Sequence, residues 1–227
     1  MSLEFENLGL ISYASCLEIQ LQHHRLVVEG RAASRIFLAE HPPVLTLGKH
    51  ANPAHLLLTR ETLQKEQIEL IHVDRGGEIT AHEKGQLLAY PILDMNALKL
   101  RPKNYVQILE ESALMLLAEF GLSAERAPGF PGVWVQKKKI AAVGIRIAQR
   151  VSYHGLSLNV NNSLKLFQKI VPCGLEGKEV CSLSSCLQRD ISITDILPRY
   201  TEILRTLISP LSDKFIRNHP TSCMARH

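Results

Sequence analysis

The chain has 227 residues, a formal net charge of +4, 45% hydrophobic residues and 21% charged residues. These proportions are typical of a globular protein and exclude a disordered, collagen-like or disulfide-scaffold chain. No apolar run approaches the roughly 20 residues of a membrane span, and the opening MSLEFENLGL lacks the basic and apolar regions of a secretory signal. The small positive charge does not indicate nucleic-acid binding, although it suits an acidic protein partner.

Five cysteines are an odd number in a chain without an export signal. Such cysteines are typical of reduced thiols, so we expect a cytoplasmic protein. No internal repeat, low-complexity tract or Pro/Gly/Ser linker divides the sequence, and we expect a single domain over residues 1–227. No heptad pattern or long apolar patch indicates self-association, so we expect a monomer.

The first predicted element is a helix over 12–29, for which Gly30 is a typical stop. Its apolar stripe is expected to contain Tyr13, Cys16, Leu17 and Leu21. His23 and His24 are expected to face water. Short apolar runs then predict strands at 34–39 and 44–47, on either side of a turn at His41-Pro42-Pro43, and at 68–73 and 87–92.

Two further helices are predicted in this half of the chain. Thr59 is a predicted N-cap of a helix that ends near Gln67. Asn104 and Gln107 resemble a capping box, and apolar residues follow them at helical spacing as far as Phe120.

The second half of the chain is rich in β-branched residues. Adjacent antiparallel strands are predicted at 132–136, 140–148 and 151–160. A short helix over 164–170 and a last helix over 195–208, with Pro198 in its first turns, complete the chain. Because strands and helices do not alternate regularly, the sequence predicts an α+β fold.

The Arg75-Gly76-Gly77 segment is the first candidate for chemistry. A glycine pair after a strand lets the backbone approach a ligand, and the Arg75 guanidinium can bind an anion or fix the loop. From the spacing alone, a plain hairpin turn with Arg75 and His82 in solvent is favoured. The segment is not a dinucleotide-binding fingerprint, because the G-x-G-x-x-G spacing is absent.

Cys173 is the second candidate, since Pro172 stiffens the turn before the thiol and Gly174 leaves room beside it. A cysteine on a turn is accessible, as nucleophilic attack requires. Lys139 and His154 are the nearest candidate partners, and an ammonium beside the thiol would lower its pKa. The alternative is an inert buried cysteine, which is the commoner fate of this residue.

Cys173, Cys181, Cys186 and His154 could supply four metal ligands, but no C-x-x-C pair exists, so a zinc site is not expected. Cys181 and Cys186 are expected to serve packing. The three lysines at 137–139 are more typical of a solvated hairpin end than of a binding patch. Trp134 is expected in the core.

Several motifs together carry a resemblance. In chain order they are Glu40-His41-Pro42-Pro43-Val44, Thr46-Leu47-Gly48, Arg75-Gly76-Gly77-Glu78-Ile79-Thr80-Ala81-His82, Gly85-Gln86-Leu87, Tyr90-Pro91-Ile92-Leu93-Asp94, Gly132-Val133-Trp134-Val135, Lys139-Ile140-Ala141-Ala142-Val143-Gly144, His154-Gly155-Leu156-Ser157-Leu158-Asn159-Val160 and Pro172-Cys173-Gly174. Their order and spacing resemble the octanoyltransferases of lipoate biosynthesis, which are related to biotin and lipoate protein ligases. The similarity extends from about residue 36 to 183.

The resemblance implies a biotin/lipoate ligase-like fold, a mixed and largely antiparallel sheet packed by helices. It also implies transfer of an octanoyl or lipoyl group from acyl carrier protein to a lysine of lipoyl domains, such as those of 2-oxoacid dehydrogenase complexes and the glycine cleavage H protein. Cys173 matches the acyl-thioester nucleophile, and Lys139 matches the lysine that lowers the thiol pKa and shuttles protons. The residues that match substrate-binding segments are Arg75, Gly76, Gly77, Glu78, Ile79, Thr80, Ala81, His82, Ala142, Val143, Gly144, His154, Gly155, Leu156 and Ser157.

Three departures from the family pattern bear on the acyl chain and not on the Cys173/Lys139 pair. Glu83-Lys84 stands where Gly-Pro is usual, Ala81 where an aromatic residue is usual, and Ser157 where alanine is usual. Because a thioester donor is already activated, the implied reaction needs no ATP, metal or other cofactor.

Three other functions stay open. An ATP-dependent lipoate or biotin ligase would share the fold, but the ligases carry a different glycine-rich segment. An amidotransferase that moves octanoyl groups between lipoyl domains also uses a cysteine nucleophile. A non-catalytic module that only binds acyl carrier protein would not acylate Cys173.

Overall fold

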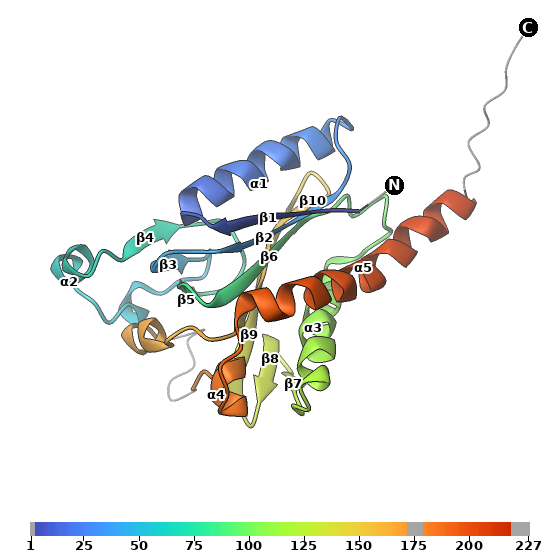
Figure 1. Ribbon diagram of the computed structural model, residues 1–227. Coiled ribbons are helices and arrows are strands. Elements are labelled where there is room, and N and C mark those ends of the chain that lie inside the picture. Colours follow the sequence, from blue (N-terminus) through green and yellow to red (C-terminus); the bar gives the residue numbers. More distant parts are fainter. Residues whose placement is uncertain (1–2, 172–178, 219–227) are drawn as a thin grey trace, which may run out of the picture.

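Two β-sheets form the centre of the computed structural model, which describes residues 3–171 and 179–218 (Figure 1). The larger sheet has seven strands in the order β1 (Glu4–Leu10), β2 (Arg35–Glu40), β6 (Gln86–Ile92), β10 (Val151–Asn159), β9 (Lys138–Ala148), β8 (Phe130–Val135) and β7 (Glu125–Ala127). The smaller sheet has the order β4 (Glu69–His72), β3 (Val44–Leu47) and β5 (Ile79–His82).

One pair in each sheet, β1–β2 and β3–β4, is parallel, and the other pairs are antiparallel. The predicted α+β class with a mixed, largely antiparallel sheet is therefore confirmed. The three strands predicted in the second half of the chain pair as expected, β8 with β9 and β9 with β10.

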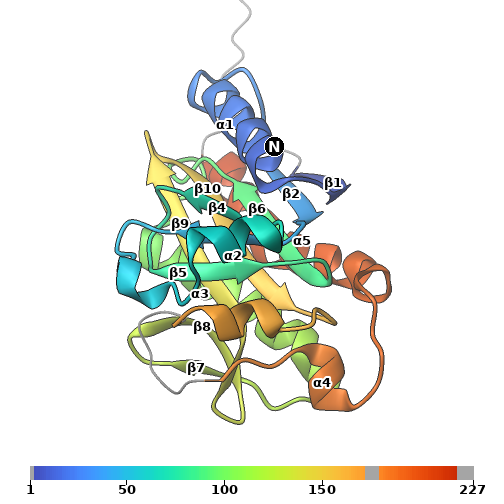
Figure 2. The ribbon, with the colours of Figure 1, turned by 90° about the vertical axis from the view of Figure 1, so that its left-hand side faces the viewer.

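Helices cover both faces of the larger sheet (Figures 1 and 2). One face carries α3 (Pro102–Glu119), α4 (Leu183–Leu187) and α5 (Ile193–Asn218), while α1 (Tyr13–Val28) lies on the other. The smaller sheet lies beyond the N-terminal end of α1, where Tyr13 stacks on His82 of β5 (Figure 1). It is accompanied by α2 (Arg60–Lys65) and the short 3₁₀ helices η1 (Pro53–His55) and η2 (Lys165–Lys169).

The alternation of side chains along a strand explains why the larger sheet has a core on each face. In β6, Leu87 and Ala89 pack in the α3/α5 core, whereas Leu88 and Tyr90 pack in the α1 core. Trp134 is buried, as predicted. Among the described residues, no helix has the length and hydropathy that crossing a membrane requires.

The buried face of α1 differs from the predicted stripe. Leu21 is 37% exposed, whereas Gln20, His23 and His24 are buried with Tyr13 and Cys16, so the expectation that both histidines face water is wrong. The rings bind backbone oxygens: His23 Nε2 lies 3.0 Å from Ala33 O, and His24 Nε2 lies 3.1 Å from Ala148 O. These contacts satisfy polar groups that could not otherwise be buried.

Other boundaries also differ. Thr59 caps α2 as predicted, but α3 begins at Pro102 with Arg101 as N-cap and without a side-chain cap, so Asn104 lies inside the helix and the predicted capping box is wrong. The expected helix over 164–170 is the 3₁₀ helix η2. The last helix is longer than predicted and extends to Asn218.

Candidate active site

A cavity of about 440 Å³ lies between the larger sheet and the loop that leads into β5. This volume is within the range of about 300–1,000 Å³ that is typical of small-molecule sites. Its walls contain every predicted substrate-binding residue except Ala81, namely Arg75, Gly76, Gly77, Glu78, Ile79, Thr80, His82, Ala142, Val143, Gly144, His154, Gly155, Leu156 and Ser157. Ala81 packs instead in a separate core with Leu45, Leu166 and Phe167.

Small residues on the two central strands make room for the cavity. The β9–β10 register places Ala142 beside Ser157 and Gly144 beside Gly155. A Cβ atom on Gly144 would lie 3.0 Å from Arg75 Cδ, and one on Gly155 would collide with Ala89 O. Glycine at these positions therefore allows the β5 loop and the neighbouring strand to approach β9 and β10 closely.

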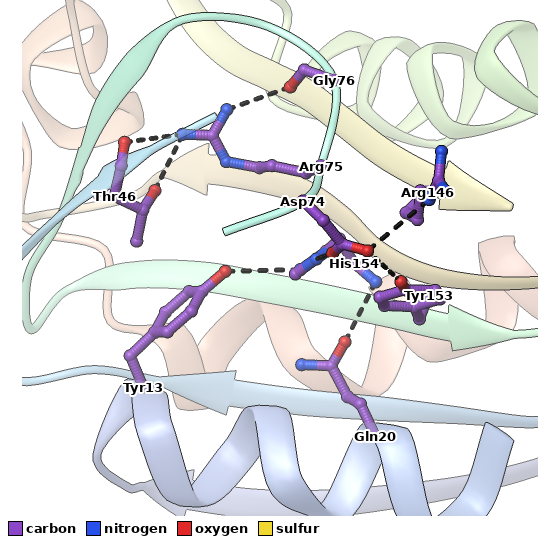
Figure 3. A network of polar contacts seen from close by, with 9 residues as sticks. All are labelled: Tyr13, Gln20, Thr46, Asp74, Arg75, Gly76, Arg146, Tyr153 and His154. Atoms are coloured by element: carbon purple, nitrogen blue, oxygen red, sulfur yellow. Dashed lines mark hydrogen bonds and ion pairs between the residues drawn. The ribbon is translucent and has the colours of Figure 1, made fainter. Parts of the chain in front are cut away.

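The buried side chain of Arg75 anchors the loop that leads into β5 (Figure 3). Its side chain is 7% exposed; Nη2 donates to the backbone and side-chain oxygens of Thr46, both at 2.8 Å, and Nη1 donates to Gly76 O at 3.0 Å. The Gly76 N–H donates to Ile145 O at 3.0 Å, which attaches the loop to β9. The hairpin with Arg75 and His82 in solvent, favoured from spacing alone, is wrong because both side chains are buried.

Lys139 also lines the cavity and differs from its two lysine neighbours. Lys137 and Lys138 are exposed, whereas Lys139 is 8% exposed with Nζ 5.2 Å from the Trp134 ring centre. Gly132, at φ 134°, makes room for the lysine side chain, since a Cβ there would lie 2.7 Å from Lys139 Cε. The Lys139 side chain is thus buried against Trp134 at the cavity wall and is not part of a solvated hairpin end.

Cys173, with Pro172 and Gly174, lies outside the described residues, but both flanks of its segment are placed. Before it, the Val171 N–H donates to His55 O at 2.8 Å. After it, the Lys139 N–H donates to Glu179 O at 2.9 Å, and the Cys181 N–H donates to Lys139 O at 3.0 Å. The chain that follows Cys173 therefore pairs with the backbone of Lys139 itself.

His154 lies at the other end of the cavity from Lys139 and does not neighbour it. It pairs with Ile145 across β9 and β10, six residues along β9 from Lys139. Its Nδ1 lies 3.3 Å from the Tyr13 hydroxyl, its Nε2 lies 3.1 Å from Asp74 Oδ1, and its N–H donates to Gln20 Oε1 at 3.0 Å (Figure 3). Tyr153 and Arg146 bind the other oxygen of Asp74.

Burial keeps the histidines of this end neutral. Desolvation lowers the pKa of His82 to about 3 and that of His41 to about 4, and it also lowers the pKa of His154. The hydrogen bond from His154 holds the pKa of Asp74 well below its usual range. These states fit one arrangement, in which neutral His154 donates from Nε2 to the Asp74 carboxylate and accepts at Nδ1 from Tyr13.

A chain of buried hydrogen bonds connects the cavity wall to Lys139. His82 Nδ1 lies 2.6 Å from Gln86 Oε1, Gln86 Nε2 donates to Asn159 Oδ1 at 2.8 Å, and Asn159 Nδ2 donates to Cys181 O at 3.0 Å. Because Cys181 also binds the backbone of Lys139, we call His82, Gln86, Asn159, Cys181 and Lys139 the polar chain.

Glu83, one of the departures, shapes the loop after β5. Its carboxylate accepts hydrogen bonds from Leu164 N and Ser163 Oγ, each at 2.9 Å, and from Asn162 Nδ2 at 3.4 Å. Glu83 thereby ties the β5–β6 turn to the chain that enters η2. Within residues 3–171 and 179–218, no group of three or more acidic, histidine or cysteine residues could hold a metal ion. Cys181 packs in the α3/α5 core and Cys186 lies against it.

Sequence reasoning missed several residues of the cavity and its surroundings. Tyr13, His50, Tyr90, Val106 and Phe130 line the cavity, and Asp74 binds one of its wall residues. Tyr90 stands in a motif quoted for the resemblance, and Asp74 directly precedes Arg75, so motif proximity could have indicated both. Val106 and Phe130 carry no sequence signal that separates them from core residues.

Known proteins similar to this chain include curated octanoyltransferases. The family model for the lipoyl protein ligase A/B catalytic domain matches residues 12–205. The octanoyltransferase of Maridesulfovibrio salexigens is 39% identical over 86% of this chain and 91% of its own length. That of Dictyoglomus thermophilum is 43% identical over 76% of this chain and 73% of its own length.

Solved structures with the same fold are more distant in sequence. A lipoate-protein ligase A bound with ATP has a TM-score of 0.71 at 12% identity, covering 95% of this chain and 92% of its own. The Aquifex aeolicus biotin protein ligase has a TM-score of 0.52 at 14% identity, covering 96% and 74%. These likenesses confirm the biotin/lipoate ligase-like fold. With the family match and the relatives, they show that this chain belongs to the octanoyltransferases, acyltransferase enzymes of the lipoyl protein ligase A/B catalytic-domain family.

Proposed function

We propose that this enzyme transfers an octanoyl or lipoyl group from acyl carrier protein to a lysine of lipoyl domains, through a thioester on Cys173. The observation that carries the proposal is the position of Lys139. Its ammonium group is held at the cavity wall, and its backbone binds Glu179 and Cys181 in the chain that follows Cys173.

The reaction has two steps. In the first, the Cys173 thiolate attacks the thioester carbonyl of the acyl carrier, the C–S bond to the carrier breaks, and the carrier thiol leaves with a proton. In the second, a lipoyl-domain lysine amine attacks the Cys173 thioester, an amide forms, and the Cys173 thiolate departs. Thioester exchange is nearly isoenergetic, whereas amide formation drives the sequence forward.

Lys139 has a role in each step. As an ammonium it stabilises the Cys173 thiolate and lowers the pKa of that thiol. Once the thiolate charge is consumed, Lys139 can give its proton to the departing carrier thiol and later take one from the attacking amine. The energy of the donor thioester replaces ATP, and the proposal requires no metal or other cofactor.

The proposed donor and acceptor are both proteins. The acceptors are lipoyl domains of 2-oxoacid dehydrogenase complexes and the glycine cleavage H protein, and the formal net charge of +4 suits acidic partners. We place the enzyme in the cytoplasm as a monomeric single domain that binds neither nucleic acid nor membrane. Free thiols at Cys16, Cys181 and Cys186 are typical of a reducing compartment.

Intact-mass measurement tests the first step. The protein is incubated with octanoyl-acyl carrier protein without ATP, together with the variants Cys173→Ala and Lys139→Ala. We expect an octanoyl adduct on the wild type that hydroxylamine removes, that is lost in Cys173→Ala and that forms more slowly in Lys139→Ala. A wild-type protein that binds the carrier but forms no adduct would contradict the proposed transfer, and the remaining functions would be a ligase or a binding module.

A further inference from the structure

The cavity has an open end and a closed end. At the open end, His50, Gly129 and Pro131 are exposed, and Phe130 is half-buried. At the closed end, Tyr13 and His154 are 2% and 1% exposed. The β9–β10 register places His154 opposite Ile145, six residues along β9 from Lys139, and both Lys139 and His154 line the cavity.

His154 connects the closed end of the cavity to a partly exposed carboxylate. The ring of His154 lines the cavity, and its Nε2 binds Asp74, whose side chain is 46% exposed. Beyond the ring there is thus a carboxylate in contact with solvent. The slot between Lys139 and this ring is bordered by small residues, Ala142, Gly144 and Gly155, which present no large side chain to an alkyl chain.

Several contacts from different elements hold this ring in place (Figure 3). Tyr13 of α1 and Asp74 of the β5 loop bind its two nitrogens, and Gln20 of α1 binds its backbone N–H. His154 has a left-handed φ of 56°, and its ring lies 4.9 Å from that of Tyr153, with both side chains bonded to Asp74. A ring bound in this way cannot swing aside without breaking buried hydrogen bonds.

We propose that His154 is the stop that sets the maximum length of the acyl chain, with Tyr13, Asp74 and Gln20 as its positioning residues. The inference rests on the proposed acyl transfer and adds its chain-length specificity. The carbonyl end of the chain lies at the Lys139 end, and the methyl end points toward His154. A chain that is too long must either displace the ring or leave methylenes in solvent at the open end.

The wild-type protein gives the first test, by native mass spectrometry with free octanoic, decanoic and dodecanoic acids. Without a stop, affinity should rise about fourfold for each added methylene, the factor that corresponds to burial of one CH₂ group. With His154 as stop, affinity should level off or fall once the chain reaches the ring. A full rise through dodecanoic acid would overturn the proposal.

Substitution of His154 gives the second test. The first variant is His154→Gly, because glycine adopts the backbone conformation at φ 56° without strain and removes the ring. The second variant is His154→Asn, because asparagine also tolerates this conformation. We expect the ratio of dodecanoyl to octanoyl kcat/KM for Cys173 acylation, with the corresponding acyl carrier proteins, to rise at least about tenfold, since newly accommodated methylenes each contribute about fourfold.

His23→Asn is the matched control, because it also removes a buried imidazole ring, but at a residue of α1 that does not line the cavity. We expect its chain-length ratio to equal that of the wild type. Folded His154 variants that keep the wild-type dodecanoyl-to-octanoyl ratio, in both acylation and fatty-acid binding, would overturn the proposal that His154 limits the length of the acyl chain. A wild type that forms no adduct with any chain length would instead refute the proposed transfer, while the fatty-acid affinities still decide the role of His154.

Discussion

The two ends of the cavity differ in charge and in access to solvent. The open end has the ammonium group of Lys139 near exposed residues such as Gly129 and Pro131. The closed end has His82 and His154, which burial keeps neutral, and the buried Tyr13 hydroxyl. A charge is costly to bury, and the closed end therefore presents neutral rings to the cavity and keeps its charge, the Asp74 carboxylate, on the side in contact with solvent.

The ends also differ in how their side chains are held. The backbone of Lys139 binds Glu179 and Cys181, and its Nζ lies over the aromatic face of Trp134. His154 is held through both ring nitrogens. This difference indicates that substitution at Lys139 should affect chemistry, while substitutions at the closed end should affect stability and chain length.

The largest expected effect is that of Lys139→Met, which keeps a long unbranched side chain, one atom shorter, and removes the charge. We expect the rate of Cys173 acylation to fall by about 10²–10⁴-fold, the range typical for loss of a proton-transfer group, with little change in thermal stability. Stopped acylation reactions analysed by intact mass give the rate. Lys138→Met is the matched control, because Lys138 is exposed and forms an ion pair with Glu179; an equal loss in both variants would contradict the role of Lys139.

The second prediction concerns pH and the closed end. Below pH 6.5 the unfolded chain takes up protons at His41 and His82, whereas burial in the folded protein lowers the pKa of His41 to about 4 and that of His82 to about 3. The unfolded state then binds more protons, so the free energy of unfolding should fall as pH falls, by up to about 1.4 kcal/mol per pH unit for each ring.

Urea unfolding at pH 7, 6 and 5 measures this slope. His82→Gln should make the dependence shallower because one buried ring is removed. A slope that is the same in His82→Gln as in the wild type would show that the closed end does not titrate in this way.

Local patterns predicted most elements, because the apolar periodicity of a helix or a strand is visible within a few consecutive residues. They missed β1, whose residues are largely exposed or half-buried and lack a clear apolar alternation. They could not distinguish Lys139 from Lys137 and Lys138, because burial of one lysine depends on Gly132 and Trp134 of the neighbouring strand. The residue pattern named Lys139 and His154 together as candidate partners of Cys173, and only the resemblance chose Lys139 between them.

The closed end was beyond local prediction for a similar reason. Tyr13 and His154 are 141 residues apart and Asp74 lies between them in the sequence, so their contact depends on the packing of α1 and the β5 loop on β10. The substrate-binding positions were predicted from the resemblance, and all of them except Ala81 line the cavity. The motif position of Ala81 is shared with wall residues, yet the alternation of β5 turns its side chain into another core.

The third prediction tests the polar chain that joins the two ends. Asn159→Ala leaves the Gln86 amide and the Cys181 carbonyl without this partner, which should lower the free energy of unfolding by about 1–3 kcal/mol. Because Cys181 binds the Lys139 backbone, kcat for acylation should fall while KM for the carrier stays close to that of the wild type. Urea unfolding and steady-state kinetics measure the two effects; an unchanged kcat would show that the polar chain serves stability alone.

The smallest expected effect is that of Tyr13→Phe, which removes one hydroxyl and keeps the ring stacked on His82. Its hydrogen bond to His154 is 3.3 Å long, so the loss of stability should be about 0.5–1.5 kcal/mol. Differential scanning calorimetry measures it. A loss above that range would mean that Tyr13 holds the closed end more strongly than its geometry indicates.

The most direct test of the proposed transfer is a chase with the isolated acyl-enzyme. Octanoylated protein, freed of acyl carrier protein and ATP, is mixed with a lipoyl domain, and the mass of both proteins is followed over one turnover. We predict that the octanoyl group leaves the enzyme and appears on the lipoyl-domain lysine at least as fast as kcat. An octanoyl group that stays on the enzyme, or moves only when ATP is added, would contradict the thioester route.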